Sequence, residues 1–252
     1  MTQPIIRFEG VSKAFGTQTV LRDFSLDVEP GAFVSIIGRS GCGKTTVLKL
    51  VNGLLSPDTG RVLIQGQDVA RIDPVALRRR IGYAIQNVGL FPHMTVEKNI
   101  AYVPAISGLK EWKGKQCREK VAALLKQVGL DPALAGRYPR ALSGGQRQRV
   151  GIARALAAGP ELLLMDEPFG AVDEITRGQL QDELLRIHRE SGITVLFVTH
   201  DIAEALKLGT RTLVMDAGQI QQYDAPSRLL ARPATSFVER LVRRSRVFQT
   251  RA

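Results

Sequence analysis

The sequence predicts an α/β protein in which a parallel core follows antiparallel strands and is interrupted by a helical segment. Three observations support this fold class. Short β-prone runs separated by turn residues fill residues 1–37. From about residue 95 to 158 the apolar residues have helical spacing. After residue 158, apolar strands alternate with amphipathic helices, which is the order of a parallel α/β sheet.

The front of the chain is expected to form strands, one phosphate-loop-like turn and two helices. Asp73 is a plausible N-cap of the second helix, with Pro74 at its first position. The expected strands are IIRFEGV (5–11), VLRDFSLDV (20–28), AFVSII (32–37), RVLIQGQDV (61–69, strand and turn) and IGYAIQ (81–86), and the expected helices are TTVLKLVNGL (45–54) and DPVALRRR (73–80).

The second half begins with helices and then returns to alternation. One helix starts after a Thr95 cap, and another, REKVAALLKQVGL, stops at Gly129. The alternating elements are the strand ELLLMDE (161–167), the helix 176–190, the strand ITVLFVTH (193–200), the helix 202–208 and a hairpin about residues 216–218. His188 is assigned to the polar face of its helix.

The composition points to an anionic partner and to a reducing compartment. The 252 residues carry a net charge of +11, which suits a nucleotide, a nucleic acid or an anionic membrane surface, although a merely basic surface explains the charge equally well. The two cysteines lack metal-type spacing, which fits a reducing cytosol. No apolar run approaches the roughly 20 residues that span a bilayer, and the N-terminus lacks signal-peptide regions. Work at a membrane would therefore need another chain to cross it.

A glycine-rich loop carries the first chemical signal. Residues 38–45, GRSGCGKT, match G-x-x-x-x-G-K-[ST] between a predicted strand and a helix, which is the context this motif requires. Its glycines let backbone N–H groups surround a phosphate, and the helix N-terminus adds a favourable dipole. Lys44 is expected to neutralise phosphate charge and Thr45 to ligate Mg²⁺. The predicted nucleotide-binding residues of this segment are Gly38, Ser40, Gly41, Cys42, Gly43, Lys44, Thr45 and Thr46.

Two carboxylates end the apolar strand Leu162–Glu167, at the edge where α/β sheets place their ligands. Asp166 suits Mg²⁺, and Glu167 suits the positioning and deprotonation of an attacking water. His200 ends another strand and could donate to a γ-phosphate, but a lone histidine there is more often structural. Gln86 ends the strand IGYAIQ and could touch Mg²⁺ or the water, which a glutamine alone does not establish.

The stretch ALSGGQRQRV (141–150) places two glycines in the first turn of a predicted helix, where each costs about 1 kcal/mol relative to alanine. Ser143 and Gln146 have the spacing of a capping box. The box does not explain Gly144 and Gly145, which remove side chains where backbone N–H groups and the helix dipole would face a phosphate.

These motifs in this order resemble the ATP-binding subunit of an ABC transporter over about residues 5–235. The resemblance rests on the phosphate loop, Gln86, LSGGQ at 142–146, LLLMDE at 162–167, Asp173 and His200. It implies a P-loop NTPase (RecA-like) parallel core with an N-terminal antiparallel β subdomain and an inserted helical subdomain. The expected domain is 1–239, with the helical subdomain at about 87–158 and a basic tail at 240–252.

The resemblance also implies roles for the matching residues. Phe15 falls where the family has an adenine-stacking aromatic, Glu167 matches the catalytic glutamate, and His200 matches the switch histidine. Catalytic roles are thus expected for Glu167, His200 and Gln86, and Mg²⁺ contacts for Thr45, Gln86 and Asp166. The nucleotide is expected to be ATP, bound also by Asp173 and by Ser143, Gly144, Gly145 and Gln146, the last four from a second copy in a head-to-tail dimer. Gly170 replaces the serine usual in the Asp173 loop.

The stretch IGYAIQNVGLFPHMTVEKNIAYVPAISG resembles the ATPases of importers for glycine betaine, choline and related quaternary amines. It implies a permease docked near Gln86–Val103, a separate solute-binding protein, and a peripheral position on the cytoplasmic face of the membrane. Many such relatives continue into CBS regulatory modules, and the sequence ends at residue 252 without them.

Other interpretations remain open. They are an importer of another small solute such as an amino acid, and less favoured, a nucleic-acid-associated ATPase, for which the chain lacks a coiled-coil or zinc-bearing insertion. A translation-factor relative would need two ATPase units, and a small-molecule kinase would not explain LSGGQ. No nucleic-acid partner is expected. The tail holds five arginines and no acid, and it could either contact lipid headgroups or be a solvated, partly disordered end.

Overall fold

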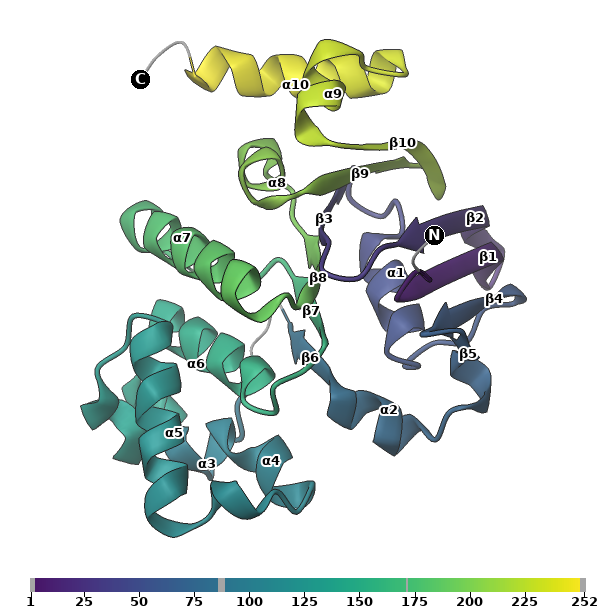
Figure 1. The fold of residues 1–252 in the computed structure, drawn as a ribbon. Helices are drawn as coiled ribbons and strands as arrows, with labels where there is room; N and C mark the ends of the chain where they lie inside the picture. The colour runs from purple at the N-terminus through teal and green to yellow at the C-terminus, as the bar shows by residue number, and fades with distance from the viewer. Residues whose placement is uncertain (1–2, 86–88, 171, 250–252) are drawn as a thin grey trace. The chain divides into compact units, whose positions relative to one another are not determined.

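A computed structural model describes residues 3–85, 89–170 and 172–249. The chain forms two compact units. The terminal unit combines Met1–Leu77 with Thr194–Ala252, and the middle unit is Arg78–Ile193, coloured from blue through teal to green in Figure 1. In the described residues, no helix is both long enough and apolar enough to cross a bilayer.

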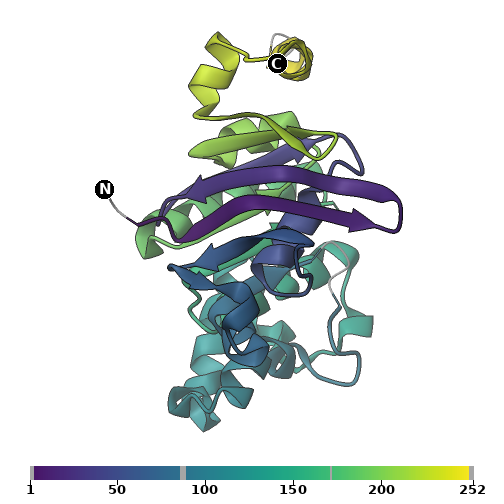
Figure 2. The same ribbon diagram turned by 90° about the vertical axis from the view of Figure 1, so that its right-hand side faces the viewer.

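An antiparallel sheet of the order β2-β1-β4-β5 belongs to the terminal unit. Its members are β1 (Ile6–Phe15), β2 (Gln18–Val28), β4 (Thr59–Ile64) and β5 (Gln67–Asp68), and the long β1–β2 hairpin is prominent in Figure 2. Register shifts between Phe8 and Ala14 mark bulges in this hairpin. Because a bulge lets a strand bend and continue, β1 runs past Gly10 to Phe15 and is longer than the predicted strand.

The parallel strands of the terminal unit are β3 (Phe33–Gly38), β8 (Thr194–Val198) and β9 (Arg211–Asp216). β3 pairs with both β8 and β9 in parallel, and β10 (Gln219–Asp224) returns antiparallel to β9. β8 is buried at every position, as expected of a parallel strand covered on both faces. The predicted hairpin about residues 216–218 is confirmed.

Helices complete the terminal unit. They are α1 (Lys44–Val51), α8 (Ile202–Leu208), α9 (Pro226–Ala231) and α10 (Ser236–Gln249), with the 3₁₀ turn η1 (Val69–Arg71). α10 continues across residues 239 and 240, between which the sequence analysis placed the end of the domain and the start of a basic tail. The division at that residue stays a prediction.

The middle unit contains two parallel strands and most of the helices. β6 (Ile81–Ala84) pairs with β7 (Leu162–Asp166). The α-helices are α3 (Val96–Ile100), α4 (Tyr102–Ile106), α5 (Gly114–Gln127), α6 (Gly144–Leu156) and α7 (Glu174–Ser191), and the 3₁₀ turns are η2 (Lys110–Trp112), η3 (Pro132–Gly136) and η4 (Pro139–Ala141). α2 (Pro74–Arg80) includes the point at which the units divide.

Local capping explains where several helices begin and end. The Thr95 hydroxyl accepts from the Lys98 amide at the start of α3, and Asp73 accepts from the Ala76 amide at the start of α2, as the sequence predicted. Gly129 follows α5 with a φ of 66°, in the left-handed region that suits a glycine after a helix.

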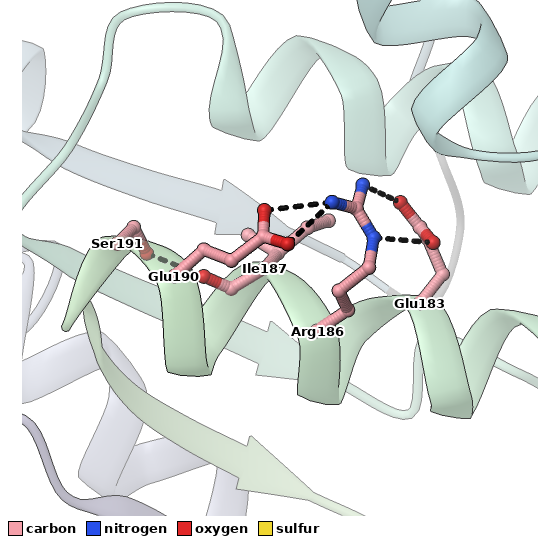
Figure 3. Close-up of polar contacts among 5 residues, drawn as sticks. All are labelled: Glu183, Arg186, Ile187, Glu190 and Ser191. Atoms are coloured by element: carbon pink, nitrogen blue, oxygen red, sulfur yellow. Dashed lines mark hydrogen bonds and ion pairs between the residues drawn. The ribbon is translucent and has the colours of Figure 1, made fainter.

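Helix α7 is longer than predicted and buries one unexpected side chain. It begins at an Asp173 cap and ends at Gly192, whose φ is 66°. On its surface, Arg186 lies between Glu183 and Glu190 and forms ion pairs with both, and the Ser191 hydroxyl donates to the Ile187 carbonyl (Figure 3). The assignment of His188 to the polar face was wrong. That side chain is only 8% exposed, because it falls on the same stripe as the buried Leu184.

Candidate functional site

The phosphate loop lies between β3 and α1 and curls through two glycines in the left-handed region. Gly41 has a φ of 77° and Gly43 a φ of 102°. A side chain at Gly43 would also lie 2.8 Å from Leu21 Cδ2 and 3.0 Å from the Val20 carbonyl oxygen. Position 43 therefore needs glycine both for its backbone conformation and for its space.

Gly38, the first residue of this loop, packs backbone to backbone on the end of β9. A Cβ added there would lie 2.1 Å from the Met215 carbonyl oxygen, which leaves no room for any side chain. The pairing of Gly38 with Met215 in the parallel ladder sets this contact. The loop is thus held at its base by the sheet.

The N-terminus of α1 is open to an anion. Among the described residues, no side-chain hydrogen bond caps this helix start, and its first turn contains no acidic residue. Lys44 is 8% exposed, and its Nζ donates to the carbonyls of Gly38 and Arg39, each at 2.9 Å. Amides, helix dipole and ammonium therefore gather at one loop, which is the arrangement that binds phosphate.

The other residues predicted for this loop differ in exposure. Ser40 and Gly41 are exposed, Thr45 is half-buried, and Thr46 is buried. Cys42 is 3% exposed, and burial raises the pKa of its thiol although the nearby Lys44 acts in the opposite direction. A neutral thiol adds no negative charge beside the Lys44 ammonium.

Phe15 ends β1 with an exposed ring, 48% accessible. The Lys13 ammonium lies 5.7 Å from the centroid of this ring. Asp58 fixes the same strand end, because its carboxylate accepts from Lys13 Nζ at 2.6 Å and from the Ala14 amide at 2.7 Å. Phe15 therefore offers an aromatic face on an anchored strand. The sequence analysis missed Lys13 and Asp58, whose separation along the chain gave no signal.

His200 follows β8 at the carboxyl edge of the terminal unit's parallel strands. Val198 pairs with Ile36, and the Thr199 amide donates to the Ile36 carbonyl at 3.2 Å. Since β3 continues directly into the phosphate loop, this register brings exposed His200 and Gly38 to the same edge.

Asp166 and Glu167 lie at the carboxyl end of β7 in the middle unit. Asp166 is 9% exposed, and burial together with the Asp166 charge raises the pKa of Tyr83 on the neighbouring strand to about 12. Glu167 is half-buried and has a φ of 46°. A non-glycine residue in this region is strained by about 1–3 kcal/mol, and such strain is concentrated at functional sites. Gln86, predicted near these acids, lies outside the described residues.

The start of α6 satisfies two of its amides through its own side chains. The Gln146 amide donates to Ser143 Oγ at 3.2 Å, and the Ser143 amide donates to Gln146 Oε1 at 2.9 Å, so the predicted capping box is confirmed. Gly144 and Gly145 occupy the first two helical positions and are half-buried. The box uses the amides of Ser143 and Gln146 and does not involve those of the two glycines.

Asp173 is exposed and caps α7, accepting from the Thr176 amide at 3.0 Å. Bonds from Thr176 lower the pKa of Asp173, and the Arg149 charge on α6 adds to this effect. The carboxylate is therefore ionised at neutral pH.

The segment from Gly89 to Tyr102 is tied together by one buried amide. Asn99 has no exposed surface, and its side chain accepts from the Phe91 amide and donates to the carbonyls of Phe91, Met94 and Thr95. Arg154 donates to the Gly89 carbonyl at 3.0 Å. Pro92 and His93 remain exposed at the tip of this turn. The sequence analysis did not single out Asn99, because an asparagine inside a helix has no distinctive pattern.

Comparison with known protein families matches the part of the chain that contains most of these motifs. The sequence model described as ABC transporter matches residues 21–170, more than half of the chain. The chain belongs to the ABC transporter family. The predicted family resemblance is therefore confirmed.

Individual relatives show which members of the family this chain is similar to. The chain is 46% identical over 248 residues to the glycine betaine/carnitine/choline transport ATP-binding protein OpuCA of Bacillus subtilis (strain 168), covering 98% of this chain and 64% of that protein. It is 48% identical over 241 residues to the glycine betaine uptake system ATP-binding protein YehX of Escherichia coli (strain K12), covering 96% and 77%. The chain thus spans less than two thirds of OpuCA.

A solved structure supports the fold. The dimeric, post-hydrolysis state of the ATP-binding cassette MJ0796 bound to ADP and Pi is 32% identical, with a TM-score of 0.81 over 88% of this chain and 98% of that one. The predicted fold class, a P-loop NTPase core with an antiparallel β subdomain and an inserted helical subdomain, is confirmed as that of ABC cassettes.

Proposed function

We propose that this chain is the ATP-hydrolysing subunit of an importer for glycine betaine, choline or a related quaternary amine. The phosphate loop of this ABC family member carries the proposal, with its two left-handed glycines, buried Lys44 and open α1 terminus. The substrate class follows that named for the relatives OpuCA and YehX.

The residues present fit a nucleoside triphosphate. Gly38 and Gly43 let the loop backbone pack where any side chain would clash with Met215, Leu21 or Val20, and this packing allows the curled path on which amides can bind phosphate oxygens. Lys44 neutralises phosphate charge, Thr46 supports the helix start, and the exposed face of Phe15 stacks on the base. Ser40, Gly41, Cys42 and Thr45 complete the loop.

Mg²⁺ would be held by hard oxygen donors that are assigned from the family motifs. Thr45 offers a hydroxyl and Asp166 a buried carboxylate, and Mg²⁺ takes such donors alongside waters and substrate phosphates. The ion supplies charge neutralisation on the transferred phosphoryl group when bound. Gln86 is assigned to this shell from its place in the family motif.

Hydrolysis in this proposal depends on positioning. Glu167 holds the attacking water and takes its proton, His200 donates to the γ-phosphate, and Gln86 links the nucleotide to the membrane partner. General-base help of this kind is worth about 10²–10⁴ in rate. The strained backbone of Glu167 supports its assignment, since strain is retained where a side chain must be aimed.

The active form is a head-to-tail pair of copies. Ser143, Gly144, Gly145 and Gln146 of one copy face the nucleotide held by the phosphate loop of the other, and Asp173 contributes to the same site. The bare glycine turn at the start of α6 supports this arrangement, as does the description of MJ0796 as dimeric.

The membrane partner is a permease that docks near Gln86–Val103, with a separate solute-binding protein that supplies the substrate. The exposed Pro92–His93 tip, held by Asn99, supports a docking role. The subunit would lie on the cytoplasmic face of the membrane as a peripheral component.

Glu167→Gln tests the chemical part of the proposal. We expect the variant to bind Mg-ATP, to persist as a closed dimer in size-exclusion chromatography, and to lose hydrolysis by about 10²–10⁴. Glu161→Gln is the matched control, because Glu161 is exposed at the opposite end of the same strand and its removal leaves turnover unchanged. Near-normal hydrolysis by Glu167→Gln would sink the assignment.

The substrate part needs the partner subunits. We expect the chain, co-expressed with its permease and binding protein, to drive ATP-dependent uptake of radiolabelled glycine betaine or choline into vesicles. Uptake of an amino acid in place of both quaternary amines would overturn the substrate class and leave the ATPase assignment standing.

A further inference from the structure

Arg39, the second residue of the phosphate loop, joins the loop to the last helix of the structure. Its guanidinium carbon lies 5.0 Å from the centroid of the Phe237 ring on α10, which is the geometry of a cation–π pair. Arg39 Nε lies 3.8 Å from Asp216 Oδ1 at the end of β9. All three residues belong to the terminal unit.

Helix α10 also packs against the residue that precedes the loop. Val238 and Val242 share a buried cluster with Ile37 of β3, and Phe237 and Leu241 pack against the edge of that cluster. Ile37 and Arg39 flank Gly38, so that α10 contacts Arg39 on one side of the loop's first glycine and shares a buried cluster with Ile37 on the other.

The backbone carbonyl of Arg39 connects the Arg39–Phe237 contact to Lys44. The Arg39 carbonyl accepts from both Lys44 Nζ at 2.9 Å and the Cys42 amide at 3.3 Å. Gly38 cannot move toward β9, because the Met215 carbonyl fills the space beside it. A displacement of Arg39 therefore changes the position of the phosphate-binding ammonium and of a loop amide together.

We propose that Phe237 is a positioning residue for the nucleotide, which holds the phosphate loop in its binding conformation through Arg39. This inference rests on the proposed function of the loop. When the Phe237–Arg39 contact is lost, the binding-competent loop becomes a smaller fraction of the population, and the apparent nucleotide affinity falls by that fraction. Any event that lifts α10 from its cluster has the same consequence.

A purely structural role for Phe237 makes a different prediction. If the ring only anchored α10, its loss would lower thermal stability and leave nucleotide affinity unchanged. Leu241 provides the comparison, since it lies one turn along the same helix, packs against the same cluster, and has no aromatic ring with which to form a cation–π pair.

The experiment measures the Kd of Mg-ADP by calorimetry on the full chain. Phe237→Leu keeps apolar packing and removes the aromatic face, and we expect it to raise Kd about two- to fivefold, the range of an exposed cation–π pair. Phe237→Tyr restores the wild-type Kd. Arg39→Gln raises Kd to a similar extent, and because this side chain is 65% exposed, the variant removes no core packing.

The double variant Phe237→Leu/Arg39→Gln decides whether the two residues act as a pair. We expect its effect on Kd to equal that of the larger single change, because the partner is already lost. Leu241→Ala should lower the melting temperature with no change in Kd. Multiplicative effects in the double variant, or a wild-type Kd for Phe237→Leu, would overturn the proposal.

Lys44→Ala separates this inference from the proposed function. Loss of Mg-ADP binding in Lys44→Ala together with a normal Kd in Phe237→Leu refutes only the positioning role. Normal binding in Lys44→Ala refutes the phosphate-loop assignment itself. If Phe237→Leu does not fold, the Kd of Arg39→Gln decides alone, with an unchanged Kd counting against the proposal.

Discussion

Two glycine-rich turns of this chain lead into helices, and they treat the helix N-terminus in opposite ways. The phosphate loop uses left-handed glycines, and the structure assigns α1 no side-chain cap. The turn before α6 keeps Gly144 and Gly145 in the helix itself and closes its end with a capping box between Ser143 and Gln146. The first turn leaves its helix start without a side-chain cap, and the second caps two of its amides with its own side chains.

The difference indicates which turn needs a ligand to be complete. A helix start without a side-chain cap presents its dipole to an anion such as a phosphate. A capped helix start needs no ligand for its capped amides. Its glycines are explained only by the close approach of a second molecule. This contrast supports the proposed primary nucleotide site in the loop and the proposed completing role of α6.

The largest expected effect comes from Ser143→Arg. The change places a long cationic side chain at the start of α6, and we expect ATP binding by a single copy to be retained while cooperative hydrolysis is abolished. Binding is measured by calorimetry, and hydrolysis by phosphate release as a function of protein concentration. Cooperative turnover in the variant would mean that α6 does not complete the site.

Matched glycine substitutions should change stability in opposite directions. Gly43→Ala forces a side chain into a φ of 102° and against Leu21, and we expect it to lower the free energy of unfolding by about 1–3 kcal/mol. Gly145→Ala lies in a helix, and we expect a gain of up to about 1 kcal/mol. Urea denaturation measures both, and a loss in both variants would contradict the contrast.

The smallest effect concerns the pH dependence of thiol modification. Because burial raises the pKa of Cys42, we expect iodoacetamide to react slowly at neutral pH and about tenfold faster per pH unit until the raised pKa is reached. Bound ATP should protect Cys42. Cys117, whose pKa is also raised by burial, serves as the unprotected control in peptide mass spectrometry. Full nucleotide binding after alkylation of Cys42 would contradict the loop assignment.

The sequence predicted those parts of the fold that depend on residues close to one another along the chain. The apolar runs of β3 and β7, the Thr95 and Asp73 caps, the Ser143 capping box and the glycine-rich loop are each set by residues within a few positions of one another. Such features depend on propensity, capping and hydrophobic periodicity, which a single sequence displays directly.

The remaining features depend on tertiary contacts. The burial of His188 follows from the packing of α7, and the length of β1 follows from bulges opposite β2. The contact between Arg39 and Phe237 joins residues far apart along the chain. The strained φ of Glu167 has no sequence signal either, because glutamate does not favour that region.

The buried amide of Asn99 has a mechanical consequence. By bonding to both backbone groups of Phe91 and to the carbonyls of Met94 and Thr95, it braces the turn that carries Pro92 and His93. A braced tip bends little under load. If a permease docks on this turn as proposed, the rigid turn transmits the conformational change of the ATPase to the permease with little loss of displacement.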